Sequence, residues 1–174
     1  MLSNADFNSD EWHADETVVK ISGVKHFLWI LLDSETRCVI TYFLSPYRSS
    51  SSAARLFQQA LLTTESVPKT IVTDRLDSYN VPIAVCYPTV KHYPYKGFKD
   101  FLNNNFIESF NKTFKAWYKT KKSFKNFRSA ELLITAFIFH YNFLHTHSSL
   151  NNLSPANVAG IIYSDKSAEN WFLI

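Results

Sequence analysis

Glycine and cysteine are both scarce in this chain, and their scarcity excludes several classes of protein. Only three glycines occur among 174 residues, so the chain has no glycine-rich phosphate loop of the P-loop or dinucleotide-binding type. The two cysteines, Cys38 and Cys86, lie far apart with no C-x-x-C pair, which argues against a zinc ribbon and against a disulfide scaffold. This use of cysteine suits a reducing cytoplasm.

Long apolar runs are also missing. The longest, residues 132–139, is much shorter than the ~18–20 apolar residues that cross a bilayer, so we expect no membrane partner. The N-terminal residues are polar and acidic, unlike a signal peptide. A hydrophobic content of 46% and an aromatic content of 16% still provide for a packed core, and the length suits one domain.

The net charge of +3 conceals an uneven distribution of charge along the chain. Residues 1–16 carry five acids and no lysine or arginine, whereas residues 112–128 carry seven basic residues and no acid. Such a basic stretch is an electrostatic footprint for a polyanion, although a solvated helix face has the same composition. Helical periodicity predicts that Phe114 and Trp117 belong to the core rather than to a base-stacking surface. The candidate phosphate contacts of the stretch are Lys112, Lys115, Lys119, Lys121 and Lys122.

The first half of the chain predicts a sheet. Residues 11–21, 26–32 and 37–44 read as three strands joined by short turns, and the continuous apolar run of the second is typical of a strand buried on both faces. A helix over residues 53–64 and a short strand over residues 70–73 follow. A strand that is reached through a helix pairs in parallel with an earlier strand, and functional residues of such sheets gather at the carboxyl ends of the strands.

The second half predicts mostly helices. Residues 83–87 and 90–93 are expected to form one interrupted strand, because Pro88 excludes a continuous one. The asparagine run 103–105 is expected to cap a helix that continues to about Lys119, and Ser129 to cap a long apolar helix. Ser154 followed by Pro155 predicts the start of a last short helix. The order of elements predicts an α/β domain with a mixed five-stranded sheet, an antiparallel meander plus parallel strands, flanked by helices.

Three acids that are far apart in the sequence, Asp15, Asp74 and Glu108, are the candidate metal ligands. Carboxylates that converge repel one another unless a cation neutralises them, and Mg²⁺ prefers oxygen ligands. Plainer interpretations exist for each acid. Asp15 could form an ordinary ion pair, Asp74 could cap a turn, and Glu108 could pair with Lys112 on a helix surface.

The segments around these acids resemble the catalytic domain of DDE transposases, which belong to the retroviral-integrase-like, ribonuclease-H-fold superfamily. The resemblance is to prokaryotic insertion-sequence transposases, and it covers residues 11–160. The matching motifs are WHADET at 12–17, VTDRLDSY at 72–79, NNFIE at 104–108 with Lys115 seven positions on, FRSA at 127–130, and YNF at 141–143 with His147, Leu150 and SPA at 154–156. Thirty-three residues separate Asp74 from Glu108, close to the usual interval in the family.

The resemblance implies a ribonuclease-H-like fold and metal-dependent phosphoryl transfer, with cleavage of DNA at transposon ends followed by strand transfer into target DNA. It implies that Asp15, Asp74 and Glu108 are the catalytic residues and hold Mg²⁺ or Mn²⁺ as two ions, and that Lys115 contacts a terminal phosphate. The implied partners are DNA and a second copy of the chain in a homodimer. The implied location is a prokaryotic cytoplasm, in association with the nucleoid.

Four residues near the motifs have their own predictions. Glu16 points to the opposite side of its strand from Asp15, so we predict a structural role. Arg75, next to Asp74, is a candidate DNA contact, although it could only offset the local acidity. His140 is predicted to be a core histidine of the apolar helix, and His92 to approach the acids from its strand.

We expect a lead-in over residues 1–10, an integrase-like catalytic domain over residues 11–160 and a C-terminal tail over residues 161–174. The N-terminal helix-turn-helix domain of related transposases is absent from the sequence. Its absence keeps open an alternative function, a catalytically silent DNA-binding remnant or regulator of transposition. A nuclease on the same fold is a further alternative.

Overall fold

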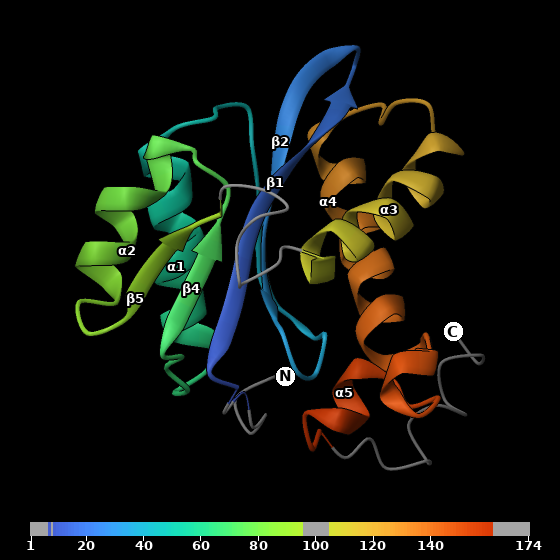
Figure 1. Ribbon diagram of the computed structural model, residues 1–174. Helices are drawn as coiled ribbons and strands as arrows, with labels where there is room; N and C mark the ends of the chain where they lie inside the picture. The colour runs from blue at the N-terminus through green and yellow to red at the C-terminus, as the bar shows by residue number, and fades with distance from the viewer. Residues whose placement is uncertain (1–6, 8, 96–104, 162–174) are drawn as a thin grey trace.

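A mixed five-stranded sheet forms the centre of the protein (Figure 1). The computed structural model describes residue 7, residues 9–95 and residues 105–161. The first three strands form an antiparallel meander, β4 pairs in parallel with β1, and β5 pairs in parallel with β4. The spatial order is therefore β3-β2-β1-β4-β5, which confirms the mixed sheet that the sequence predicts. The strands are β1 (Glu11–Ile21), β2 (Val24–Asp33), β3 (Val39–Ser45), β4 (Thr70–Thr73) and β5 (Lys91–Pro94).

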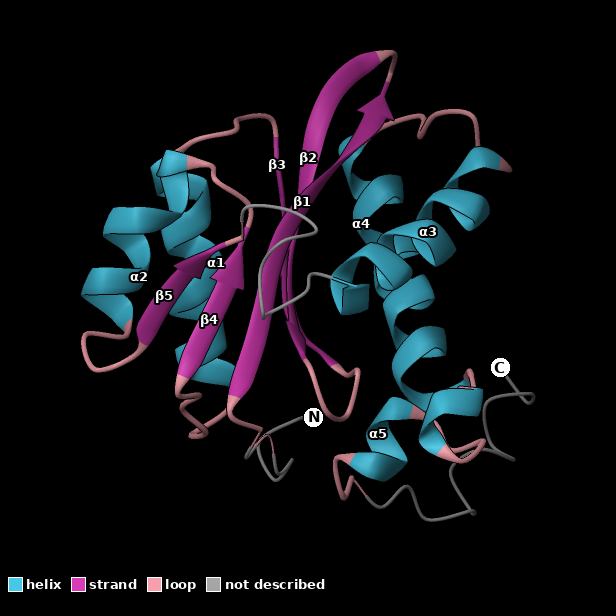
Figure 2. Cartoon of the chain, in the orientation of Figure 1, coloured by secondary structure: helices cyan, strands magenta, loops and turns pink. Residues whose placement is uncertain are grey.

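Helices cover both faces of the sheet, and Figure 2 shows them as separate layers on its two sides. On one face lie α1 (Ser50–Thr63) and α2 (Asn80–Cys86), and on the other lie α3 (Asn105–Lys119) and α4 (Phe127–Phe139). Side chains along each strand alternate between the two faces, so β1 and β2 contribute to two separate cores. Trp12 and Trp29 pack in the core beneath α1, whereas Val19 and Ile30 pack in the core beneath α3 and α4. This double burial explains the unbroken apolar run of β2.

The segment predicted to be an interrupted strand over residues 83–87 is instead helical, so that prediction is wrong for its first part. A short 3-10 turn over Asp77–Tyr79 leads directly into α2. Pro82 and Ile83 are buried while Val81 and Val85 are exposed, which is the spacing of a helix and not of a strand. Proline is tolerated in the first turn of a helix, so Pro82 does not prevent it.

Helix α4 begins slightly before the predicted cap. Asn126 is the N-cap, and its side-chain oxygen accepts a hydrogen bond of 2.8 Å from the Ser129 backbone N–H. Ser129 is the third residue of the helix, and its hydroxyl accepts a hydrogen bond from the Asn126 backbone N–H. The two residues form a reciprocal capping box, in which the predicted cap residue plays the second part. The predicted cap residues 103 and 104 of α3 lie outside the described residues.

A π-helical turn over His140–Leu144 continues α4. Tyr141 and Asn142 are buried, whereas His140 is exposed, so the prediction of a core histidine is wrong. The Asn142 side chain accepts from the Val39 backbone N–H and donates to the Val39 carbonyl, each at 2.9 Å. The asparagine of the YNF motif therefore ties the end of the helical layer to the start of β3.

The last helix, α5 (Pro155–Val158), starts as the sequence predicts, with Ser154 as its N-cap and Pro155 at its first position. Its neighbour in space is the π-helical turn, at the end of the molecule opposite the β1–β2 hairpin (Figure 1). Across the described residues, no helix combines the length and the apolar character that a membrane-spanning segment needs.

Candidate active site

The parallel pairing of β1 with β4 brings the first two acids together. Ala14 of β1 lies opposite Thr73, the last residue of β4. Asp15 and Asp74 are the residues that follow this pair, so they are neighbours at the carboxyl end of β4. One oxygen from each of Asp15, Glu16 and Asp74 lies within 4.8 Å of the other two. We call these three side chains the carboxylate group. No other set of three potential metal ligands comes this close together among the residues that the structure describes.

Asp15 is oriented by hydrogen bonds to both of its oxygens. The Asn111 side chain, from α3, donates to Oδ2 at 2.6 Å, and the Glu16 backbone N–H donates to Oδ1 at 2.9 Å. Burial and the neighbouring charge of Glu16 raise the pKa of Asp15 to about 7, and the charge of Asp74 acts in the same direction. Burial and the nearby negative charges thus disfavour the ionised form of this aspartate.

Glu16 lies on the other face of β1, where its partners come from different elements. Tyr79 donates its hydroxyl to Oε2 at 2.7 Å, and the Arg48 Nε–H donates to Oε1 at 2.6 Å. Burial raises the pKa of Glu16, as does the charge of Asp74, although the bonds from Tyr79 and Arg48 oppose the shift. The strand alternation predicted from sequence is confirmed. Glu16 nevertheless keeps one oxygen within reach of the two aspartates.

Asp74 closes the tight turn that follows β4. Its Oδ1 accepts a hydrogen bond of 2.9 Å from the Leu76 backbone N–H. Its Oδ2 lies 3.4 Å from Nη2 of Arg48, so Arg48 contacts both Asp74 and Glu16. The local turn holds the carboxylate just beyond the end of β4, and Arg48 adds a contact from a distant loop.

Glu108, the third acid of the prediction, lies in the first turn of α3 and is exposed. It precedes Asn111 by one helical turn, and Asn111 touches Asp15. The start of α3 is fixed against the sheet by Phe106, whose ring meets the His13 ring edge-on at 5.5 Å and lies 4.2 Å beneath the Arg37 guanidinium. The carboxylate of Glu108 is not one of the three that meet within 4.8 Å. Its role as a ligand therefore stays a prediction.

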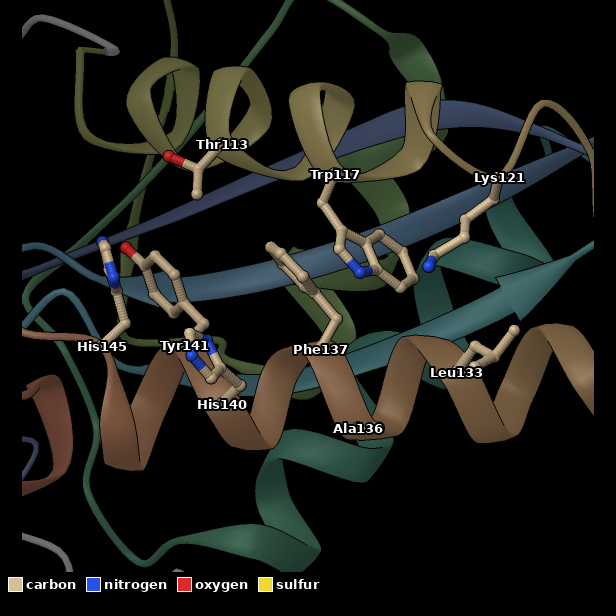
Figure 3. Close-up of a pocket in the computed structure, with 9 residues that line it drawn as sticks. All are labelled: Thr113, Trp117, Lys121, Leu133, Ala136, Phe137, His140, Tyr141 and His145. Atoms are coloured by element: carbon tan, nitrogen blue, oxygen red, sulfur yellow. The ribbon is translucent and has the colours of Figure 1, made fainter.

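The predicted phosphate contacts all face solvent. Lys112, Lys115, Lys119, Lys121, Lys122 and Arg75 are exposed. A groove between α3 and α4 runs past one of them, with a cavity volume of about 490 Å³ (Figure 3). Trp117 and Phe137 line the groove, and the ammonium nitrogen of Lys121 lies 5.5 Å from the centre of the Trp117 ring. Phe114 is buried as predicted, whereas Trp117 is only partly buried.

Three contacts of the site were missed by sequence reasoning. Asn111 carries a signal that could have been used, because it is a polar residue on the apolar, buried face of α3. Tyr79 ends the second motif but has no feature that links it to Glu16. Arg48 lies in a loop far from every motif, so only the fold reveals it. His92, from β5, does approach the site, where its Nε2 lies 2.8 Å from the hydroxyl of Thr73.

Comparison with known proteins agrees with this geometry. The family described as the DDE domain matches residues 9–147. The chain belongs to the DDE domain family of transposases. No curated protein matches the chain.

Solved structures that resemble this DDE domain include the catalytic cores of retroviral integrases. The catalytic core of HTLV-2 integrase, in complex with magnesium, has a TM-score of 0.60 and 18% identity, over 91% of this chain and 98% of that one. The catalytic core of BIV integrase has a TM-score of 0.63 and 12% identity, over 94% of this chain and 98% of that one. A chain of the simian T-cell lymphotropic virus intasome has a TM-score of 0.65 and 16% identity, over 91% of this chain.

These likenesses establish the fold. They confirm the ribonuclease-H-like architecture that the motifs imply, with its five-stranded mixed sheet and flanking helices. The DDE domain spans about half of the simian intasome chain, 55% of its length. The family match makes this chain a DDE domain, and the solved structures show its fold.

Proposed function

We propose that this DDE domain catalyses metal-dependent phosphoryl transfer on DNA, with strand cleavage at transposon ends and strand transfer into target DNA. The observation that carries the proposal is the meeting of Asp15, within β1, and Asp74, just after the carboxyl end of β4, within 4.8 Å of each other and beside Glu16. Ligand sites in sheets with parallel strands lie at the carboxyl ends of those strands. The family match supports the same chemistry.

The donor atoms of the site suit a hard divalent cation. All the ligand atoms are carboxylate oxygens, which Mg²⁺ and Mn²⁺ accept. Burial first, and then the charges of Glu16 and Asp74, raise the pKa of Asp15, and a bound cation would favour its ionised form. Asp15, Asp74 and Glu108 would hold the metal, as two ions. Such ions act as Lewis acids that activate the attacking oxygen and stabilise the leaving oxygen of an in-line displacement. The HTLV-2 integrase core, which shares the fold, is in complex with magnesium.

The residues of the chain itself supply orientation. Asn111 holds Asp15 in one rotamer, and the Leu76 backbone N–H does the same for Asp74. Partners of this kind fix the direction of ligand oxygens before the substrate arrives. The exposed lysines of α3 and of the turn after it would meet phosphates, and Arg75 would add a contact beside Asp74.

The proposal includes the partners and the setting that the sequence implies. DNA is the substrate and a second copy of the chain is the expected partner in a homodimer; the HTLV-2 core has dimeric and trimeric forms. The catalytic domain extends over residues 11–160, and the family match covers most of that range. A prokaryotic cytoplasm, with association to the nucleoid, is the proposed location.

Metal-dependent cleavage of an oligonucleotide duplex tests the chemistry. The purified chain is expected to nick duplex DNA with Mg²⁺ or Mn²⁺ and not with EDTA, and Asp74→Asn is expected to lose at least ~100-fold in rate. Asp77→Asn, an exposed acid three residues away, is the matched control and should cleave normally. Cleavage that survives Asp74→Asn would remove the assignment. DNA binding without any cleavage would favour the regulator instead.

The third ligand needs its own variant. Glu108→Gln should reduce cleavage about as much as Asp74→Asn, whereas Glu131→Gln, an exposed glutamate in the first turns of α4, should have no effect. Glu16→Gln separates the two arrangements of three acids. If Glu16→Gln abolishes Mn²⁺ binding and Glu108→Gln leaves it unchanged, the triad is Asp15, Glu16 and Asp74.

A further inference from the structure

Arg48 occupies an unusual position at the carboxylate group. It contacts two of the three carboxylates, yet its side chain is 44% exposed. The two contacts differ. The Nε–H bond to Glu16 is 2.6 Å long and the Glu16 side chain is only 3% exposed, whereas the contact with Asp74 is 3.4 Å long and the Asp74 side chain is 38% exposed. Arg48 is therefore anchored to Glu16 and only loosely bound to Asp74.

The loop that carries Arg48 is itself held in place. It joins β3 to α1, and the hydroxyls of Ser45 and Ser52 lie 2.9 Å apart across it. Ser45 Oγ accepts from the Tyr47 backbone N–H at 3.0 Å, and Ser52 donates to the Tyr47 carbonyl, also at 3.0 Å. Both serines are buried. The backbone next to Arg48 is thus fixed by hydrogen bonds, which limits the positions that the guanidinium can reach.

Glu16 is fixed from its other oxygen. Tyr79 is fully buried and donates to Oε2 at 2.7 Å, so the order of contacts runs from Tyr79 to Glu16 to Arg48. Glu16 differs from the two aspartates because its buried carboxylate already has a cationic side chain, Arg48, as a close partner. It is well suited to hold a cationic side chain that faces outward.

We propose that Arg48 binds a DNA phosphate at the reaction centre, and that Glu16 and Tyr79 serve to position it. This inference rests on the proposed function, because it places the phosphate next to Asp15 and Asp74. The planar guanidinium presents several donors at once, a geometry that matches phosphate oxygens. In the structure, Nη2 of Arg48 lies 3.4 Å from Oδ2 of Asp74. If Asp74 held a metal, Arg48 would keep its bond to Glu16 and would present its remaining donors to the phosphate.

The proposal predicts opposite effects of one substitution on two affinities. Arg48→Ala removes a cation that competes for an Asp74 oxygen, so Mn²⁺ should bind equally well or a few-fold more tightly. The same variant should bind a short duplex oligonucleotide about tenfold more weakly in the presence of Ca²⁺, and the slope of log affinity against log salt should fall by about 0.9. Arg55→Ala is the matched control. Arg55 is an exposed arginine of α1 whose guanidinium lies over the Phe43 ring.

Glu16→Gln provides a second test whose sign is decisive. Removing a negative charge beside a DNA site raises DNA affinity by simple electrostatics. If Glu16 positions Arg48, however, DNA affinity should fall and the salt slope should decrease, and Glu16→Gln should cause little further loss in an Arg48→Ala background. Arg48→Lys keeps the charge but not the planar fork, and should retain the salt slope with a weaker affinity.

The outcomes separate this inference from the proposed function. Arg48→Ala that binds DNA with the affinity and salt slope of Arg55→Ala would overturn the inference alone. Higher DNA affinity for Glu16→Gln would do the same. Unchanged Mn²⁺ binding by the double variant Asp15→Asn/Asp74→Asn would overturn the proposed function, and a wild-type chain that does not bind DNA would overturn both. Thermal melting of each variant, followed by circular dichroism, identifies any that fail to fold.

Discussion

The carboxylate group and the basic stretch over residues 112–128 carry opposite charges and are built in opposite ways. Each of the six oxygens of Asp15, Glu16 and Asp74 has a hydrogen-bond or ion-pair partner, supplied by β1, α3, the turn after β4 and the loop that contains Arg48. The lysines of the basic stretch project into solvent from one helix and the turn that follows it. The position of each acid is fixed by its hydrogen-bond partners, whereas the lysines contribute only their number and their positive charge.

This difference determines how each region should respond to substitution. A carboxylate held where the pairing of β1 with β4 ends has no substitute, because its position comes from the register of two strands. An exposed lysine has neighbours of the same charge that can take over its phosphate. We therefore expect large and specific effects in the carboxylate group, and small, additive effects along the basic stretch.

The largest effect is expected from the double variant Asp15→Asn/Asp74→Asn. It removes two anionic ligands of one site while keeping the size of both side chains, so Mn²⁺ affinity should fall by at least ~100-fold. Isothermal titration calorimetry measures this directly, without any need for catalysis. Asp10→Asn is the control, because Asp10 is an exposed acid that pairs with Lys69. Equal Mn²⁺ affinities for the double variant and the control would show that the carboxylate group is not a metal site.

The pH dependence of stability is the next effect in size, and its sign follows from the raised pKa of Asp15. The folded protein keeps a proton on Asp15 up to about pH 7, whereas the unfolded chain loses it near the ordinary value of 3.8. The folded state therefore binds more protons between these values, and stability without metal should fall as pH rises through this range, by up to roughly 4 kcal/mol. Burial also raises the pKa of Glu16 and Asp33, which adds to the same trend.

Urea unfolding at about pH 5 and about pH 8 measures that trend. Asp15→Asn has no proton to lose, so its free energy of unfolding should change less between the two pH values than that of the wild type. Saturating Mn²⁺ should also remove part of the loss, because it favours the ionised carboxylates. A wild-type protein that gains stability with rising pH would contradict the assigned burial of Asp15.

Asn111 should have an intermediate effect. Its amide donates to Asp15 across the space between α3 and β1, and it is buried. Asn111→Ala leaves the ligand in place but removes its orientation, so Mn²⁺ affinity should fall about 10–100-fold. Asn157→Ala, an exposed asparagine of α5, controls for the change of residue type. If Asn111→Ala binds Mn²⁺ as well as the control does, the orientation of Asp15 comes from the Glu16 backbone alone.

The sequence predicts the parts of this site that depend on strand order. The meander and the parallel return of β4 follow from residue patterns, but those patterns alone do not bring Asp15 to Asp74. The motif resemblance added the fold and the choice of acids. Residues 83–87 were misjudged because a short run of apolar residues looks the same in a strand and in a helix. Only the burial of Pro82 and Ile83 against α1 distinguishes the two.

The partners of the acids could not be predicted, because they come from elements that meet only after folding. Arg48 lies 32 positions from Glu16 and Asn111 lies 96 positions from Asp15. No local sequence pattern indicates contacts between residues so far apart in the sequence. His140 was misjudged for a different reason: α4 is apolar on more than its buried side, and His140 lies on the exposed side with Leu133 and Ala136.

The smallest effects are expected from single substitutions in the basic stretch. Replacing any one of Lys112, Lys115, Lys119, Lys121 and Lys122 by alanine should weaken DNA binding about two- to threefold at moderate salt, and each lysine that meets a phosphate should take about 0.9 from the salt slope. The loss should not depend on DNA sequence, because a lysine at a phosphate reads no base. Lys91→Ala, an exposed lysine of β5, serves as the control. Fluorescence anisotropy with duplexes of several sequences measures both quantities. A single lysine whose loss weakened binding 100-fold, or did so for one sequence only, would have a defined partner as the carboxylates do. That lysine would then be an exception to the contrast between the carboxylate group, whose side chains have fixed partners, and the basic stretch, whose side chains act through their charge alone.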